Sequence, residues 1–452
     1  MLEKLFNLKE NHTTVRTEVI AGITTFMTMA YILAVNPSLL SAAGMDSNAV
    51  LMATAIASFI GTLLMSLLAN YPFALAPGMG LNAYFAFTVC GNMGYSWQIA
   101  LLAVFIEGLI FIILSLTNVR EAIFNAIPMN LKHAVSAGIG LFIAFLGLQG
   151  AYLCVSDSST LVAMLDFTEN FHQEGICAIL AIIGLFLIAI MHIKQVKGAI
   201  LYGILITWIL GMICQATGIY VVDVEREFYS LFPSFSSFDI TAIGKTFGQA
   251  FHADFSNVSI LNFIMVIFSF LFVDIFDTLG TLIGVSSKAN MLDKDGKLPR
   301  IKPALLADAI ATSAGAILGT STTTTFVESS SGVAAGGRTG LSSMVTAILF
   351  LVAIVFAPLF TAIPGFATAP ALIFVGFLMV TSILKVDLTD PIEGIPAYLC
   401  VLSMPLFYSI AEGIAVGVIS YVVLHIFCGK AKKVTPLMYV LAVLFILKYI
   451  FL

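Results

Sequence analysis

Residues 319–340 read GTSTTTTFVESSSGVAAGGRTG, a run with almost no large aliphatic side chain between two apolar segments of membrane length. Backbone N–H and C=O groups at bilayer depth must be hydrogen-bonded, so protein must cover such a run or it must line a wet cavity. A broken helix at a binding site meets this condition. The single carboxylate, Glu328, lies where an extended threonine segment gives way to a small-residue helix at 329–336. We therefore expect Glu328 to contact a bound ligand.

The composition is that of a polytopic membrane protein surrounded by lipid. Of 452 residues, 60% are hydrophobic and 10% are charged, against roughly 25% charged in soluble domains. The length accommodates about fourteen helices of roughly 20 residues. No polybasic tail indicates binding to nucleic acid. The N-terminus lacks a short apolar core with a small-residue cleavage site, so we expect the first span to be retained.

The six cysteines are scattered, mostly within apolar segments, without CxxC spacing or a pattern of histidine partners. Core packing explains such cysteines better than disulfide bonds or metal binding. We therefore expect no metal site and no organic cofactor.

Fifteen apolar segments define the expected helices. The first seven lie near residues 17–36, 50–69, 75–90, 97–117, 129–150, 175–192 and 198–219. The next seven lie near 260–285, 303–319, 327–337, 341–361, 368–384, 395–410 and 411–428. A last apolar run, 437–452, is either an additional span or a helix packed at the membrane interface.

Lysine and arginine residues cluster in alternate loops, which sets the orientation. With the N-terminus inside and fourteen crossings, every basic cluster lies on the cytoplasmic side, as the positive-inside rule requires. The loops assigned to the outside agree, because 151–174 contains no Lys or Arg and 221–259 is mainly acidic.

Two short matches indicate an internal repeat. The sequence AIAS at 55–58 corresponds to AIAT at 309–312, and GICA at 175–178 corresponds to GIPA at 394–397. Because seven spans is an odd number, the second copy starts on the opposite side of the membrane, so the repeat is inverted. Inverted repeats are typical of secondary transporters.

A second break occurs in the first repeat, at YPFALAPGMGLN (71–82). Its two prolines and two glycines prevent a continuous helix. Two half-helices from opposed repeats would direct their N-termini toward one point in the membrane midplane. The alternative is that residues 71–82 form a Pro-kinked helix that packs against its neighbours and binds no ligand. The candidate ligand contacts at the two breaks are Gly80, Asn82, Phe85 and Ser329.

Two further acids lie three residues apart within an apolar span, Asp274 and Asp277, and therefore share one helical face. Placing a carboxylate at the centre of a membrane-spanning helix costs about 2.5–3.5 kcal/mol. We therefore expect at least one of the two acids to be functional. The alternative is that they make structural hydrogen bonds to another helix. With Glu328 at the same cavity, mutual repulsion would leave at least one acid protonated, which favours proton coupling. Glu107 and Glu412 are expected mainly to contact neighbouring helices.

The sequence resembles the adenine/guanine/hypoxanthine permease branch of the nucleobase:cation symporters, and most closely bacterial guanine/hypoxanthine permeases. The motifs that carry the resemblance cover nearly the whole chain: GITTFMTMAYILAVNP (22–37), FALAPGMGLNAYFAF (73–87), AGIGLFIAFLGLQG (137–150), FLFVDIFDTLGTL (270–282), GTSTTTTFVESSSGVAAGGRTGL (319–341) and PLFYSIAEGIAVG (405–417).

The resemblance implies an all-α membrane protein with a 7+7 inverted-repeat fold of about fourteen spans, in which spans 3 and 10 begin as short extended strands. A core domain would slide against a gate domain in an elevator motion, within a homodimer. The implied boundaries are core 1–120 and 260–362, gate 121–222 and 363–430, an extracellular loop at 223–259 and a hydrophobic C-terminal segment at 431–452.

The resemblance also implies the function, a proton-coupled importer of purine nucleobases in the bacterial cytoplasmic membrane rather than an enzyme. By similarity, Asn82, Asp274, Asp277 and Glu328 bind the purine or couple it to protons. Guanine and hypoxanthine are the expected substrates, and adenine is the close alternative. An anion transporter of similar fold and an intramembrane aspartyl enzyme are the remaining alternatives; the enzyme would need its two acids on facing helices.

Overall fold

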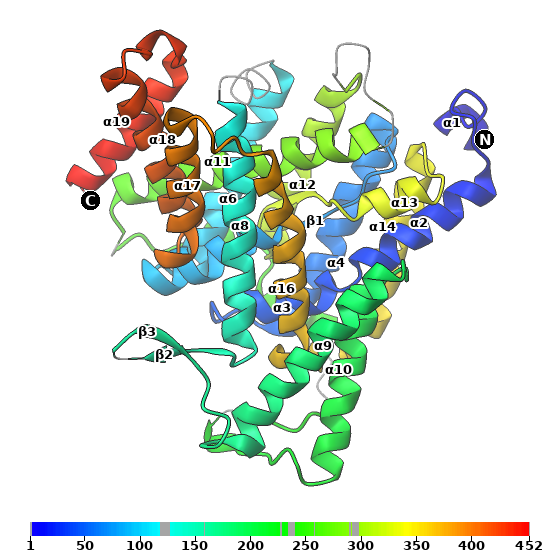
Figure 1. Ribbon diagram of the computed structural model, residues 1–452. Helices are drawn as coiled ribbons and strands as arrows, with labels where there is room; N and C mark the ends of the chain where they lie inside the picture. Colours follow the sequence, from blue (N-terminus) through cyan, green and yellow to red (C-terminus); the bar gives the residue numbers. More distant parts are fainter. Residues whose placement is uncertain are drawn as a thin grey trace.

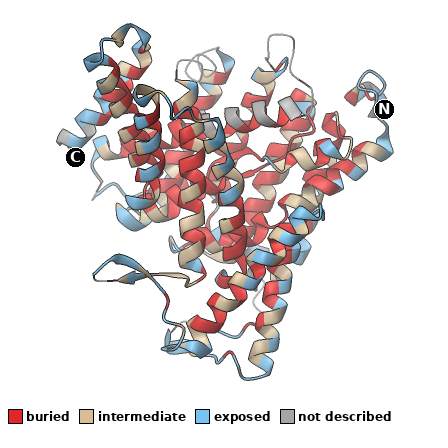
Figure 2. Ribbon diagram, viewed as in Figure 1, coloured by how far each residue is buried: buried red, intermediate tan, exposed pale blue. Residues whose placement is uncertain are grey.

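The structure is a computed structural model that describes residues 2–117, 127–157, 159–226, 228–233, 240–256, 258–288, 291 and 298–451. Helices dominate it; the strand Leu75–Pro77 lies among them, whereas the hairpin of Cys154–Asp157 and Leu161–Met164 projects away from the helices (Figure 1). Buried residues concentrate in the middle of the helix assembly, whereas the loops and the outward helix faces are exposed (Figure 2).

The first half contains these elements: α1 (Leu2–Phe6), α2 (Val15–Met29), α3 (Ile32–Ser41), α4 (Ser47–Leu64), η1 (Met65–Ala69), β1 (Leu75–Pro77), α5 (Met79–Ala83), η2 (Tyr84–Asn92), α6 (Trp97–Leu116), α8 (Met129–Gly150), β2 (Cys154–Asp157), β3 (Leu161–Met164), η3 (Phe171–Gly175), α9 (Ile176–Ile193) and α10 (Ala199–Ala216). Short turns η4 (Val224–Arg226), η6 (Ile240–Lys245) and η7 (Gln249–His252) follow in the connection between the halves.

The second half contains these elements: α11 (Ile260–Lys288), α12 (Ile301–Leu318), β4 (Thr323–Thr325), α13 (Ser329–Ala334), α14 (Gly340–Ala353), η8 (Ile354–Phe356), α15 (Ala357–Thr361), α16 (Gly365–Val380), η9 (Thr381–Lys385), α17 (Pro391–Leu406), α18 (Ile410–Phe427), η10 (Ala431–Lys433) and α19 (Pro436–Phe451). Across the described ranges, 10 helical segments are long and apolar enough to cross a membrane. The expected count of fourteen crossings stays a prediction.

The two breaks in the sequence meet at a two-stranded antiparallel sheet. Strand β1 pairs with β4 so that Leu75 lies opposite Thr325 and Pro77 lies opposite Thr323. The pairing continues past both ends, because the Gly78 N–H donates to the Thr322 carbonyl at 3.0 Å and the Phe326 N–H donates to the Ala74 carbonyl at 3.0 Å. The strand pair thus satisfies the facing backbone groups of these non-helical segments, and side chains satisfy others, as where the Leu75 N–H donates to the Thr62 hydroxyl at 2.9 Å.

Short helices follow both strands, α5 after β1 and α13 after β4. Small residues let α13 lie directly on α2, since a Cβ atom at Gly332 would stand 2.0 Å from the Thr25 hydroxyl and 2.8 Å from the Ala21 carbonyl. The buried Glu18 carboxylate on α2 accepts hydrogen bonds from the backbone N–H groups of Arg338 and Thr339, just after α13. This contact fixes the end of the second break.

The helices pack into two groups. In the core group, α6 and α4 pack on α12, and α2 and α4 pack on α14. In the gate group, α8 packs on α16 and α17, α9 packs on α10 and α16, and α17 packs on α18. We use these two names below for α2–α6 with α11–α15 and for α8–α10 with α16–α18. Their assignment to separately moving domains stays a prediction.

Glycines bring α8 and α16 close together at the centre of the gate group. A Cβ atom at Gly140 would lie 2.7 Å from the Gly376 carbonyl oxygen, and one at Gly376 would lie 2.5 Å from the Gly140 carbonyl oxygen. Only residues without a side chain fit at this crossing, which is how small residues promote helix packing in membranes.

The C-terminal run forms α19, which packs on α18. Phe445 lies edge-on to Phe268 and Phe272 of α11, with ring centroids at 5.8 Å and 6.3 Å. The Tyr449 hydroxyl donates to the Glu412 carboxylate of α18. The helix therefore contacts both the core group and the gate group.

Candidate functional site

Glu328 lies directly before α13, at the end of the extended segment that contains β4. Its Oε1 atom accepts a hydrogen bond of 2.7 Å from the Tyr31 hydroxyl, between α2 and α3. The Tyr31 side chain is fully buried, whereas Glu328 keeps part of its surface exposed. Tyr31 therefore holds one carboxylate oxygen of Glu328 in place, while the side chain remains partly accessible to a ligand.

Asp277 reaches the strand pair from α11. Its Oδ2 atom accepts a hydrogen bond of 3.4 Å from the Thr324 hydroxyl of β4. The same oxygen would stand 3.2 Å from a Cβ atom at Gly78, so the absence of a side chain there leaves room for the carboxyl group. Asp277 is partly exposed and interacts electrostatically with Glu328 and Asp308.

Asp274 is fully buried, one helical turn from Asp277. The Thr278 hydroxyl lies 2.8 Å from Asp274 Oδ1 and 3.1 Å from Asp308 Oδ1. Asp308 is also fully buried and comes from α12. One hydroxyl has one proton to donate, so these two contacts are both favourable when one of the carboxyl groups is itself protonated and donates back. The structure thus pairs Asp274 with an acid on another helix.

Asn82 and Ser329 fasten the two breaks to each other. The Ser321 hydroxyl donates to Asn82 Oδ1, which joins the start of the second break to α5. In the opposite direction, the Ala74 N–H donates to Ser329 Oγ at 3.0 Å, which joins the start of the first break to α13. Both Asn82 and Ser329 are fully buried. Each break is therefore tied to the short helix of the other.

Gly80 and Phe85 lie on the two sides of the first half-helix. A Cβ atom at Gly80 would stand 2.9 Å from Ile139 Cγ2 of α8, so α5 touches the gate group there. Phe85 is fully buried, with its ring centroid 6.5 Å from that of Phe270 on α11. Gly80 therefore lies where the core and gate groups meet, and Phe85 lies within the core group.

The strand pair brings Asn82, Asp277, Glu328 and Ser329 to one junction, and Asp274 lies one turn of α11 away. Their roles toward a ligand stay predictions, as do those of Gly80 and Phe85. Of the two acids expected to contact neighbouring helices, Glu412 accepts a hydrogen bond from Tyr449 of α19. Glu107 Oε2 instead accepts one of 2.7 Å from Thr322, in the extended segment before β4.

Sequence reasoning missed Tyr31, Asp308 and Glu18 at this site. Asp308 carried the same signal as Asp274, a carboxylate inside an apolar span, and could have been found in that way. Glu18 and Tyr31 lie in and beside the first apolar segment, but nothing in a single sequence shows which distant residues they contact.

The comparison with protein-family models places the chain in a family. The Xan_ur_permease model, described as the permease family, matches residues 16–416. The chain belongs to this permease family. It is accordingly a multi-pass protein of the cell membrane that acts in transport and not as an enzyme.

Relatives match it from end to end. A putative permease of Methanocaldococcus jannaschii is 49% identical over 451 residues, which is 100% of this chain and 98% of the relative. The guanine/hypoxanthine permease PbuG of Bacillus subtilis is 46% identical, with 100% of both chains covered. The adenine permease AdeP of Escherichia coli is 42% identical, with 100% of this chain and 96% of the relative covered.

Solved structures confirm the fold. The transmembrane domain of the cyanobacterial bicarbonate transporter BicA superposes with a TM-score of 0.63 at 17% identity, over 88% of this chain and 96% of that chain. SLC26A9 gives a TM-score of 0.59 at 12% identity, over 92% of this chain and 66% of that chain. The expected helical 7+7 inverted-repeat transporter fold is therefore confirmed, and at these identities the likeness concerns the fold alone.

Proposed function

We propose that this permease imports purine nucleobases, with guanine and hypoxanthine as its main substrates, by symport with protons. The observation that carries the proposal is the similarity to a guanine/hypoxanthine permease, which is 46% identical over the full length of both chains. Adenine is the second candidate, because an adenine permease is 42% identical over the same length. Because the identities to the two permeases, 46% and 42%, are similar, competition between guanine and adenine in an uptake assay decides the preferred purine.

The junction of the two breaks suits such a substrate. Guanine and hypoxanthine present neighbouring N–H and C=O groups on a flat ring. The Glu328 carboxylate can accept from a ring N–H, and the Asn82 amide can offer both a donor and an acceptor. Glu328 is already partly exposed, whereas Asn82 is covered and held by Ser321. Substrate binding at Asn82 would therefore require the contact with Ser321 to open.

Carboxyl groups around the junction support coupling to protons. Asp277 and Glu328 are partly exposed and interact with each other electrostatically. Asp274 and Asp308 are sealed behind them and approach the same Thr278 hydroxyl. Like charges this close favour retention of a proton by part of the set. Binding of a proton together with the substrate would lower the repulsion, so the proton serves as the coupling ion and no organic cofactor is needed.

The packing supports an elevator motion. The strand pair and its acids belong entirely to the core group, and this group meets the gate group at contacts such as that of Gly80 with Ile139. A rigid core group could carry the substrate past the gate group without any change in the site itself. We propose this movement, in a homodimer whose gate groups stay fixed.

An anion transporter is the rival suggested by the fold, since BicA is a bicarbonate transporter. The acids at the junction argue against it, because carboxylates repel an anionic substrate. Uptake of bicarbonate or sulfate without uptake of any purine would favour the rival.

The test is uptake of radiolabelled hypoxanthine by purine-uptake-deficient cells that express the chain. We expect accumulation that unlabelled guanine inhibits and that an uncoupler of the proton gradient abolishes. Stronger competition by adenine than by guanine would assign the adenine specificity. Accumulation that requires sodium and survives the uncoupler would replace the proton, and no uptake of any purine would refute the proposed function.

A further inference from the structure

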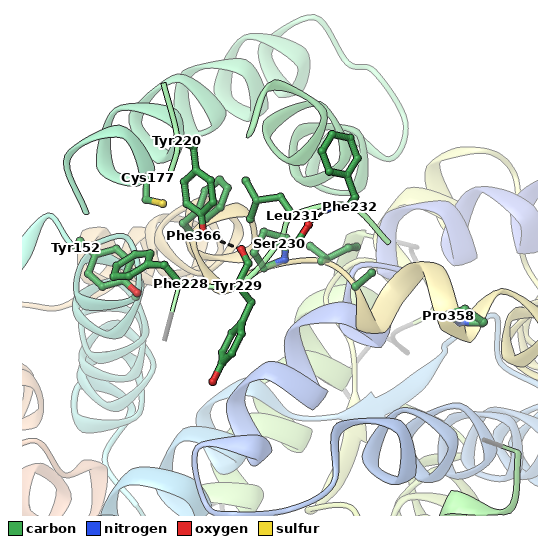
Figure 3. A pocket seen from close by; sticks show the side chains of 15 residues that line it. Tyr152, Cys177, Tyr220, Phe228, Tyr229, Ser230, Leu231, Phe232, Pro358 and Phe366 are labelled. Atoms are coloured by element: carbon green, nitrogen blue, oxygen red, sulfur yellow. Dashed lines mark hydrogen bonds between the residues drawn. The ribbon is translucent and has the colours of Figure 1, made fainter. Parts of the chain in front are cut away.

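Two cavities lie at the end of the gate group that the charge pattern assigns to the outside. The first, here called the outer cavity, has a volume of about 410 Å³ and lies between the end of α8, the start of α16 and the loop residues 220 and 228–232 (Figure 3). The second, here called the seam cavity, has about 230 Å³ and lies between α3 and η2 of the core group and α8 and α16 of the gate group.

Hydrogen bonds hold the wall of the outer cavity in place. The Tyr220 hydroxyl donates to the Tyr229 carbonyl at 2.8 Å, which is the contact drawn in Figure 3. The Trp208 indole N–H donates to the Leu231 carbonyl at 2.8 Å, and the Leu231 N–H donates to Gln215 Oε1 at 2.7 Å. Both partners on α10 are part of a long helix. The loop is therefore anchored, and the cavity is a built feature of the fold.

The lining of the outer cavity suits a flat, polar ring. The Tyr152 and Phe228 rings lie 5.6 Å apart with planes inclined by 35°, and the Tyr220 ring stands at 61° to Phe228. Such faces and edges bind other aromatic rings. Gly365 and Phe366 also line the cavity and begin the 16-residue helix α16. The Ala367 and Thr368 N–H groups donate to the Pro364 carbonyl, whereas those of Gly365 and Phe366 stand in the first turn, where a helix supplies no acceptor of its own, and can face a carbonyl oxygen of a ligand.

Gly150 and Gly365 line both cavities, so the two cavities adjoin at these glycines, a place here called the neck. A Cβ atom at Gly365 would meet no heavy atom within 4 Å, and one at Gly150 would come no closer than 3.8 Å, to Ala369. Other glycines of the gate group are needed for close packing, as at Gly140. At the neck, in contrast, the missing side chains leave open space.

The seam cavity leads toward the candidate site. Phe87 and Tyr408, whose ring centroids are 5.9 Å apart, belong to its lining. The Tyr408 hydroxyl donates to Gln149 Oε1 at 3.0 Å, within the gate group. Phe87 belongs to η2, which continues α5 without interruption and so lies on the same broken span as Asn82. The two cavities therefore form a series from the outer loop to the broken span.

We propose that the outer cavity is a docking site for the transported nucleobase, and that the neck between Gly150 and Gly365 is its route into the seam. The proposal rests on the proposed function for the identity of the substrate. The volume lies within the roughly 300–1,000 Å³ of small-molecule sites. Aromatic faces, free helix N–H groups and continuity with the broken span all favour a planar heterocycle over a lipid chain, which would need none of them.

The route is tested by filling the neck. Gly365→Trp places a large side chain where a Cβ atom meets no heavy atom within 4 Å. Gly244→Trp is the matched control, because a Cβ atom at Gly244 also meets no heavy atom within 4 Å and the residue lies in the η6 turn, outside both cavities. We expect at least a tenfold loss of initial hypoxanthine uptake for Gly365→Trp, and less than a twofold change for Gly244→Trp, at equal abundance in the membrane.

Calorimetry on the purified proteins separates blockage from misfolding. A route sets rates and not equilibrium affinity, so Gly365→Trp should bind hypoxanthine with a Kd within about threefold of wild type. The docking site is tested separately by Tyr152→Ala, which should raise the KM for uptake severalfold and leave kcat unchanged.

The route, the docking site and the proposed function are each overturned by a different result. Wild-type uptake by Gly365→Trp would overturn the route, and would leave the outer cavity to lipid or another occupant. An unchanged KM in Tyr152→Ala would overturn the docking site. If the wild-type protein takes up no purine at all, the proposed function fails and this proposal falls with it, which distinguishes that failure from a failure of the route alone.

Discussion

Replacing Tyr31 with phenylalanine removes one atom from the candidate site and leaves the ring in place. The lost hydroxyl is the donor of the 2.7 Å hydrogen bond to Glu328 Oε1. Because the Tyr31 side chain is fully buried, water cannot readily substitute for it. The variant therefore asks how much the fixed position of Glu328 contributes to transport, without changing the number of acids at the site.

The size of the effect depends on the charge of Glu328. A hydrogen bond to an ionised group contributes about 1.5–3 kcal/mol, and one between neutral groups about 0.5–1.5 kcal/mol. Since about 1.4 kcal/mol corresponds to a factor of ten, Tyr31→Phe should lower kcat/KM for uptake by roughly 10- to 150-fold if Glu328 is ionised when it meets the substrate. If Glu328 is protonated at that step, the loss should be only about 2- to 12-fold.

The assay is the initial rate of radiolabelled hypoxanthine uptake as a function of concentration, corrected for the amount of protein in the membrane. Tyr439→Phe is the matched control, because the Tyr439 hydroxyl donates to the Ala431 carbonyl at 3.0 Å near the C-terminus and away from the junction. Glu328→Gln should abolish concentrative uptake altogether. Uptake by Tyr31→Phe within twofold of wild type, beside an inactive Glu328→Gln, would refute the idea that Tyr31 positions this carboxylate.

Three further predictions concern neighbouring residues. Asp274→Asn should abolish concentrative uptake, whereas Asp277→Asn should retain substrate binding by calorimetry and lose part of the coupling; equal effects of the two on both measurements would contradict the distinction. Gly80→Ala should slow uptake, because its Cβ atom would stand 2.9 Å from Ile139 Cγ2 and such overpacking costs about 1–3 kcal/mol. Adding Ile139→Ala should restore the rate. If the double variant stays slow, the defect arises from another contact. Glu18→Ala removes the buried carboxylate that accepts hydrogen bonds from the α13–α14 connection and from Ser342. Each donor left unpaired lowers the free energy of unfolding by about 1–3 kcal/mol, so the Tm of the purified protein should fall. An unchanged Tm would show that water replaces the carboxylate.

Much of the fold could be predicted from the sequence because a bilayer imposes local rules. Runs of apolar residues must be helices, basic loops must lie inside, and a run such as TSTTTTFVESSSG cannot face lipid. The breaks at 71–82 and 319–340 and the acids at 274, 277 and 328 follow from such rules. The function at the level of a permease followed as well, because the motifs that carry it are contiguous stretches of chain.

The partners of these residues could not be predicted, because they come from remote parts of the chain. Tyr31 and Glu328 are 297 positions apart, and Asn82 and Ser321 are 239 apart. Periodicity gives the face of a helix on which a side chain lies, but it does not say which other helix packs there. The pairing of Asp274 with Asp308 through Thr278 depends on the contact of α11 with α12, which no local pattern encodes.

The sequence alone determined that this chain is a membrane protein of two opposed halves with interrupted helices and buried acids, since each of these features is a demand that lipid makes on a short segment. Only the tertiary structure decided that the interruptions satisfy each other as a strand pair, which carboxyl groups meet, and where cavities remain between the helix groups. The physical reason is that hydrogen bonds and cavities depend on distances of a few ångströms between residues hundreds of positions apart, and those distances are set by packing.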